Sequence, residues 1–257
     1  MTYKEQWVAF ATILRREVHR FMRIWLQTLL PPVITITLYF IIFGTLIGSR
    51  IGPMGGYSYM EFIVPGLIMM SVITNSYSNV VSSFYGAKFQ HYVEEILVSP
   101  MPNSIILWGV VMGGVTRGLL VGGIVTLVAT FFTDLQVERP LLTIGIVLIT
   151  SVLFSLAGFI NAVFANSFDD ISIVPTFVLT PLIYLGGVFY STDLLSEFWA
   201  DVSLINPILY IVNAFRYGVL GVSDVDITWA VTIIFGFTLL AYAYAMYLLV
   251  TSKRLRS

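Results

Sequence analysis

The sequence predicts an all-α membrane protein with six transmembrane helices, an N-terminal amphipathic interfacial helix and an external re-entrant helical hairpin before the last span. Six apolar runs each reach the roughly 20 residues that a helix needs to cross the hydrocarbon core of a bilayer. The 257-residue chain is 58% hydrophobic and 11% charged, whereas an ordinary soluble domain has about 25% charged residues. The runs are Ile24–Ile47, Phe62–Phe84, Ile105–Phe132, Leu141–Phe164, Ile171–Tyr190 and Ile227–Val250.

We expect a single transmembrane domain over residues 1–257, because six spans leave little chain for a soluble domain. It divides into an interfacial helix (1–23), spans one to five (24–190), an external hairpin (191–226) and span six (227–250). In the first segment, aromatic and aliphatic residues recur at helical spacing opposite a basic face, which is typical of a helix lying among lipid headgroups. The apolar positions are Tyr3, Trp7, Phe10, Leu14, Val18, Phe21 and Trp25.

The basic residues predict that both termini are cytoplasmic, because cytoplasmic loops retain lysine and arginine. This orientation puts nine basic residues inside and three outside, and the opposite orientation would reverse that ratio. The nine are Lys4, Arg15, Arg16, Arg20, Arg23, Lys88, Lys253, Arg254 and Arg256; the three are Arg50, Arg139 and Arg216.

Polar side chains at helical spacing mark the second span, and the third carries the only ionised residue inside any of the six runs, Arg117. Serine, threonine and asparagine often join transmembrane helices to one another, and they can equally line a polar pathway. An intramembrane charge must meet a partner, a carbonyl or water. We therefore treat the following residues as candidates for a pathway or a helix interface: Asn75, Ser78, Asn79, Arg117, Thr176 and Tyr184.

Glycines four residues apart in the third span, at positions 114, 118 and 122, predict a close approach by another helix. The spacing leaves open whether that helix belongs to this chain or to a second copy.

A short cytoplasmic helix is expected over Ala87–Val98, between Gly86 and the Ser99-Pro100-Met101-Pro102 stretch. Its polar side includes Lys88, Glu94 and Glu95, and its apolar side Phe89, Val93, Ile96 and Leu97. It is either a solvated interfacial helix or a plug for a cytoplasmic partner.

Residues 191–226 predict two short helices dipping in from outside, broken at Pro207, since each half is too short to cross a membrane. Arg216 within this apolar segment needs a partner. The candidates are an outward-side acid (Glu61, Asp193 or Asp201), a helix-end carbonyl, or the lipid headgroups.

Several kinds of chemistry are missing from the sequence. There is no cysteine, no glycine-rich phosphate loop ending in Gly-Lys-Ser or Gly-Lys-Thr, no His-Glu-x-x-His and no Gly-x-Ser-x-Gly. No basic patch suited to nucleic acid exists outside the two termini. No span interior holds a carboxylate, which disfavours a proton-coupled carrier without excluding it.

The stretch Leu-Thr-Pro-Leu-Ile-Tyr-Leu-Gly-Gly-Val-Phe-Tyr from Leu179, followed by Asn-Pro-Ile-Leu-Tyr-Ile-Val-Asn-Ala-Phe-Arg ending at Arg216, resembles the signature of type-2 ABC exporter permeases. The signature positions are Pro207, Tyr210 and Arg216. The resemblance covers the whole chain and is closest to short bacterial members that carry the permease alone.

This resemblance implies a permease homodimer in the bacterial cytoplasmic (inner) membrane, docked on a separate cytosolic ABC ATP-binding subunit that binds ATP and magnesium. The chain itself would hold no cofactor and would not be an enzyme. The helix with Lys88, Phe89, Glu94 and Glu95 would be the ATPase-coupling helix. Cargo would be an amphipathic, lipid, glycan or drug-like molecule. An ion- or proton-coupled carrier and a non-transporting scaffold are the alternatives.

Overall fold

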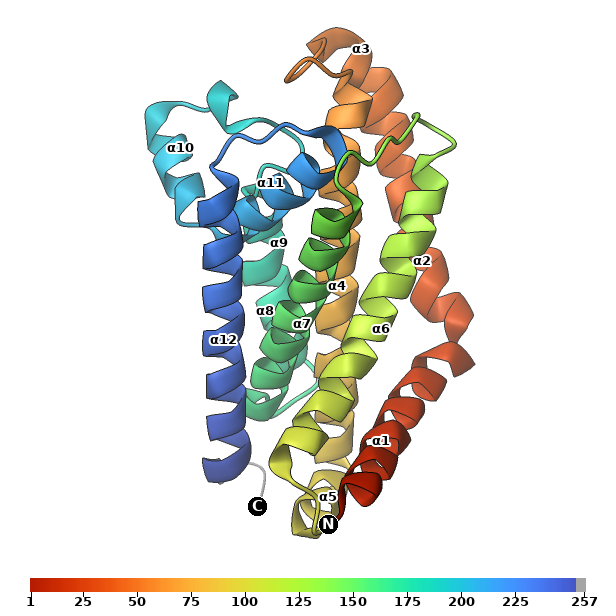
Figure 1. Cartoon of the computed structure of the whole chain (residues 1–257). Helices are drawn as coiled ribbons and strands as arrows, with labels where there is room; N and C mark the ends of the chain where they lie inside the picture. Colours follow the sequence, from red (N-terminus) through yellow and green to blue (C-terminus); the bar gives the residue numbers. More distant parts are fainter. Residues whose placement is uncertain (253–257) are drawn as a thin grey trace.

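The computed structural model describes residues 1–252, which form helices and no β-strand (Figure 1). The basic residues expected at positions 253–256 lie outside this described part. The elements are α1 (Tyr3–Arg23), α2 (Trp25–Tyr39), π-helical η1 (Phe40–Ile47), α3 (Gly48–Ile51), α4 (Tyr59–Phe89), α5 (Tyr92–Val98), α6 (Asn103–Ala129), α7 (Pro140–Phe164), α8 (Asp170–Val174), π-helical η2 (Pro175–Leu179), α9 (Thr180–Tyr184), the 3-10 turn η3 (Thr192–Leu194), α10 (Glu197–Leu204), α11 (Pro207–Leu220) and α12 (Ile227–Thr251).

Helix α4 is the centre of the bundle and packs against α6 and α7. Its apolar side chains are buried on almost every side, whereas α2 and α12 leave most of theirs exposed. Exposed apolar faces of this length are expected of helices that meet lipid. Helix α4 begins with a capping box in which Ser58 and Glu61 satisfy each other's backbone amides.

Five helices in the described part are long and apolar enough to cross a membrane: α4, α6, α7, α12 and the Trp25–Gly44 segment. The fifth expected span is shorter than the sequence predicts, because the helical segment is Asp170–Tyr184 instead of Ile171–Tyr190. Its middle is the π-helical turn η2, which begins at Pro175, a residue without an amide hydrogen for a regular helical bond.

The pair α10–α11 is bent by 88° at a short break, as expected of a helical hairpin interrupted at Pro207. Both helices lie at the end of the bundle that also holds α3, whereas the N-terminus, α5 and the last turn of α12 lie at the opposite end (Figure 1). The pair counts as a sixth candidate span only if it is taken as one broken helix.

Helix α1 was expected to lie among lipid headgroups, with an apolar face opposite a basic one. In the structure it packs along α6, and its buried residues share only Phe21 with the expected apolar positions. Its buried residues are Ile13, Glu17 and Phe21, while Tyr3 and Trp7 are exposed. The packing is possible because α6 has glycines there: a Cβ on Gly109 would lie 2.6 Å from Ile13, and one on Gly113 would lie 2.5 Å from Glu17.

The glycine line of α6 packs within the chain. A Cβ on Gly114 would meet Val80 of α4, one on Gly118 would meet Ser76, and one on Gly122 would lie 2.6 Å from Val72. Small residues at this spacing therefore seat α4 against α6.

Two neighbouring glycines give a direct test of this packing. Gly122→Ala is expected to lower the thermal unfolding midpoint in detergent, because overpacking a tight contact costs about 1–3 kcal/mol. Gly123→Ala is the matched control, because a Cβ there meets nothing within 4 Å and alanine is the better helix former. Equal midpoints for the two variants would contradict the packing described here.

Candidate functional site

The polar side chains of α4 face three neighbours. In the predicted stripe, Asn75 and Ser78 face a groove beside α2, and Asn79 meets α1 through Arg20. Ser76, which does not belong to that stripe, lies against the glycines of α6. The stripe predicted from the sequence thus serves both a groove and helix packing.

The groove, of about 310 Å³, lies between α2, α4 and α6. Polar side chains line it from α2 (Gln27, Thr28, Thr35) and from α4 (Ser71, Thr74, Asn75, Ser78), and Arg117 comes from near the middle of α6. The structure therefore brings three of the sequence-predicted candidates, Asn75, Ser78 and Arg117, to one site. Arg117 donates a hydrogen bond of 3.2 Å to Oδ1 of Asn75.

Thr176 and Tyr184 do not line this groove. Thr176 is exposed on η2, and Tyr184 lies at the far end of α9, where its hydroxyl is 3.3 Å from that of Tyr39. That contact joins α9 to α2 near the end of the bundle that carries α3.

A buried carboxylate, Glu17, was not singled out by the sequence, because it lies among the basic residues of a helix that was expected to lie in the membrane interface. Only 1% of it is exposed. Its carboxylate accepts a short hydrogen bond from Ser83 of α4 and contacts Arg16 at 3.1 Å and Arg20 at 3.5 Å. Arg20 also donates to the carbonyl and side-chain oxygens of Asn79, at 2.9 and 2.8 Å. These contacts fix α1 to α4.

The short helix expected over Ala87–Val98 has different bounds in the structure. Residues 87–89 continue α4, and α5 covers only Tyr92–Val98 after His91, whose backbone is left-handed at φ 61°. Gly86 lies inside α4 and ends nothing. A turn at Gln90 and His91 therefore separates the two helices.

The expected apolar side is confirmed within α5, where Val93 is buried and Ile96 and Leu97 pack partly buried against the core. Lys88 differs from its expected place on the polar side of this helix, because it lies in α4 and donates at 2.8 and 2.7 Å to the carbonyls of Val163 and Ala165, at the end of α7. Lys88 therefore caps the C-terminal end of α7. Glu95 is exposed and Glu94 is partly exposed, with His91 3.1 Å away. On α5 and the last residue of α4, the exposed apolar side chains are Tyr92, Val98 and Phe89.

The hairpin is held by Arg216, which is fully buried. Its guanidinium donates to the carbonyl of Gly187 at 2.6 Å and to that of Phe62 at 3.3 Å, and it stacks 3.9 Å from the Phe62 ring centroid. The backbone carbonyl of Gly187, in the segment after α9, is thus a partner of Arg216. Of the alternatives that the sequence left open, the carbonyl is the one that the structure shows; the buried side chain does not reach the headgroups, and Glu61 is occupied in its own capping box.

The other signature residues shape the hairpin itself. Pro207 is the first residue of α11, a position where its missing amide costs nothing, and Asn206 caps that helix through Ile208. The hydroxyl of Tyr210 donates to the carbonyl of Leu204 at 2.7 Å, which ties α11 back to α10. Gly221 ends α11 with a left-handed backbone.

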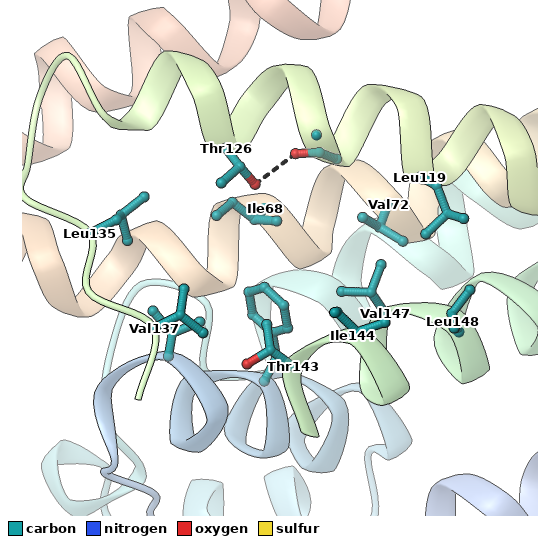
Figure 2. Close-up of a pocket in the computed structure, with 14 residues that line it drawn as sticks. Ile68, Val72, Leu119, Thr126, Leu135, Val137, Thr143, Ile144, Val147 and Leu148 are labelled. Atoms are coloured by element: carbon teal, nitrogen blue, oxygen red, sulfur yellow. Dashed lines mark hydrogen bonds between the residues drawn. The ribbon is translucent and has the colours of Figure 1, made fainter. Parts of the chain in front are cut away.

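A second cavity, of about 300 Å³, lies between α4, α6, α7 and α11 and is lined almost wholly by apolar side chains (Figure 2). Its two threonines donate their hydroxyl hydrogens to backbone carbonyls, Thr126 to Gly122 at 2.8 Å and Thr143 to Arg139 at 2.9 Å. The cavity suits a hydrocarbon and offers no charged group to bind a polar one, which separates it from the groove beside α2.

Comparison with known proteins decides the family. A family model described as ABC-2 type transporter matches residues 8–220. The chain belongs to the ABC-2 type transporter family. It is 58% identical over 251 residues to the inner membrane transport permease YadH of Escherichia coli (strain K12), covering 98% of each chain. It is 23% identical over 222 residues to nodulation protein J of Rhizobium leguminosarum bv. trifolii, covering 86% of this chain and 84% of the relative.

Membership of the ABC-2 type family makes this chain a membrane permease subunit that does not itself hydrolyse ATP; nucleotide is bound by a separate ATPase subunit, with which the permease associates. The signature residues that pointed to the family are those that build the hairpin.

Proposed function

We propose that this chain forms the translocation pathway of an ATP-driven exporter for an amphipathic, lipid, glycan or drug-like molecule, and that it works as a homodimer in a bacterial inner membrane. The observation that carries the proposal is the groove beside α2, where polar side chains and Arg117 face open space at the depth of the spans. Polar side chains at that depth face a cavity or a partner and not lipid. YadH is named an inner membrane transport permease, which supports the location.

The proposed topology has six spans, with both termini and α5 in the cytoplasm. The segment α8–η2–α9 serves as the fifth span, and α10–α11 is a re-entrant hairpin on the outer side. The basic-residue ratio supports this orientation. So does the gathering of the N-terminus, α5 and the last turn of α12 at one end (Figure 1).

We propose that α5 and the end of α4 form the surface that docks the ATPase. Phe89, Tyr92 and Val98 present apolar side chains there, and Glu94 and Glu95 stand beside them. This division, with apolar anchors and polar neighbours, is typical of a protein interface.

Reversing two charges on α5 tests the docking surface and the permease assignment together. Glu94→Arg with Glu95→Arg is expected to reduce co-purification of the ATPase at least tenfold, or to uncouple ATP hydrolysis from export in the reconstituted complex. The permease should still elute as a single species, because both residues lie on its surface.

Glu197→Arg is the matched control, since it reverses an exposed charge in the first turn of α10, at the other end of the bundle. It should leave co-purification unchanged. Normal assembly and export in the α5 variant would remove this docking surface. Failure of the unaltered chain to bring down any ATPase would remove the exporter proposal.

The alternative, a carrier coupled to ions or protons, would need a carboxylate free to exchange protons inside the spans. Glu17 is the one buried carboxylate in the part of the chain that the structure describes. It belongs to α1 and is already bound by two arginines and Ser83. This occupancy favours the ATP-driven exporter.

A further inference from the structure

The groove beside α2 holds a cation that its surroundings do not neutralise. Arg117 makes one hydrogen bond, to the Asn75 amide oxygen, and its buried Nε has no hydrogen-bond partner. Among residues 1–252, no carboxylate lies within ion-pair distance of it. A guanidinium at membrane depth is costly unless an opposite charge, carbonyls or water compensate it.

The buried acid of the neighbouring helix α1, Glu17, is already bound elsewhere. The carboxylate of Glu17 already contacts Arg16, Arg20 and Ser83, so it does not neutralise Arg117. Arg117 therefore faces the groove as a positive charge that no carboxylate of residues 1–252 neutralises.

The other deeply placed arginine has more partners. Arg216 has two carbonyl acceptors and an aromatic face, although its buried Nη1 has no hydrogen-bond partner, and it lines neither of the two cavities described above. Arg117 has a single amide oxygen and lines open space. The difference indicates that Arg117 leaves donors available for a ligand, since a guanidinium has five.

The residues around Arg117 also indicate the chemistry of the rest of the ligand that the groove would bind. Hydroxyl and amide groups of Gln27, Thr74 and Ser78 line it near Arg117. Beside it, α2 exposes an apolar stripe at four-residue spacing (Leu26, Leu30, Ile34 and Leu38). A polar pocket with one cation next to an exposed aliphatic stripe fits a molecule with an anionic head and a hydrocarbon tail.

We propose that the groove between α2, α4 and α6 binds the anionic group, a phosphate or carboxylate, of an amphiphile whose hydrocarbon chain lies along α2. Arg117 binds the anion through its free guanidinium donors, and Asn75 positions that guanidinium. The same chemistry is offered by an anionic bilayer lipid and by a single-chain cargo. That the cargo uses this site rests on the proposed export function; the binding itself does not.

Binding is tested on the full-length chain in dodecyl maltoside by native mass spectrometry, without ATP or ATPase. The probes are dodecyl phosphate, phosphatidylglycerol, phosphatidylcholine and inorganic phosphate. We expect saturable binding of dodecyl phosphate that is weakened roughly tenfold or more in Arg117→Gln, which is the effect of losing one charge-assisted hydrogen bond. Arg117→Lys, which keeps the charge, should retain most of the binding and covers the case in which the glutamine variant fails to fold.

Arg15→Gln is the matched control, because it removes one exposed positive charge of α1 outside the groove, and it should bind like the unaltered chain. Binding of phosphatidylglycerol as tight as that of dodecyl phosphate supports the proposal with a bilayer lipid as occupant, and weaker binding supports it with a single-chain amphiphile. Equal binding by Arg117→Gln, no preference over phosphatidylcholine, or equally tight binding of inorganic phosphate would overturn it. Because the assay contains no ATPase, loss of the exporter assignment would leave its result standing.

Discussion

Replacing Glu17 by alanine is expected to release α1 from the bundle. The substitution removes the acceptor for Ser83 and leaves Arg20 without its acid, while Arg20 remains beside Asn79. Removing one partner of a buried ion pair costs about 3–5 kcal/mol. We expect the low end of that range, because the side chain of Arg20 is 34% exposed and water screens it.

The release can be measured in two ways. The thermal unfolding midpoint in detergent should fall, and trypsin should cut α1 faster at Arg15 and Arg16, because a detached helix opens locally more often. Glu17→Gln should give a smaller effect, since glutamine can still accept from Ser83. Glu5→Gln is the matched control, because Glu5 is an exposed capping residue of the same helix. If trypsin cuts Glu17→Ala no faster than Glu5→Gln, Glu17 does not hold α1.

Replacing Arg216 by lysine is expected to loosen the hairpin and impair export while expression stays near normal. Lysine keeps the charge but loses the planar fork that reaches two carbonyls at once. One hydrogen bond of a charged donor is then lost, which costs about 2 kcal/mol, and the stacking on Phe62 weakens. Amide hydrogen exchange across Pro207–Leu220 should accelerate, because Arg216 joins α11 to α4 and to the chain after α9.

Arg139→Lys provides the matched control for this variant. Arg139 also stacks on an aromatic ring, 3.8 Å from the centroid of Tyr217, and donates to the Tyr217 carbonyl at 3.3 Å, but it is exposed. Water replaces those contacts at little cost, so exchange and export should stay near normal. We infer that Arg216 holds the hairpin as a lid over the outer exit of the pathway. A silent Arg216→Lys variant would end that inference.

The positions of the helices could be read from the sequence wherever the signal is local. Long apolar runs predicted α2, α4, α6, α7 and α12, and Pro207 predicted the break between α10 and α11, because span length and proline geometry depend only on neighbouring residues. The family could be read for the same reason, since its signature is a set of spacings along one segment.

The boundaries around α5 show where local signals fail. Gly86 was expected to end a helix, yet α4 continues to Phe89 and buries its apolar side chains on almost every side. Burial against neighbouring helices outweighs the small helix preference lost at one glycine. Lys88 likewise was taken as a surface charge, and its position at the end of α7 depends on how two distant helices meet.

What the sequence by itself determined is that this protein spans a membrane, five of its six expected spans, its hairpin and its family, because each is encoded in composition or in short-range spacing. The tertiary structure alone decided which residues meet. It placed Glu17 against Ser83 and Arg216 against the Gly187 carbonyl. It also placed Arg117 in an open groove, where the side-chain amide of Asn75 is its one hydrogen-bond acceptor. Periodicity shows that a face is polar, but a charge is neutralised by groups from other helices, and only the packed bundle brings those groups together.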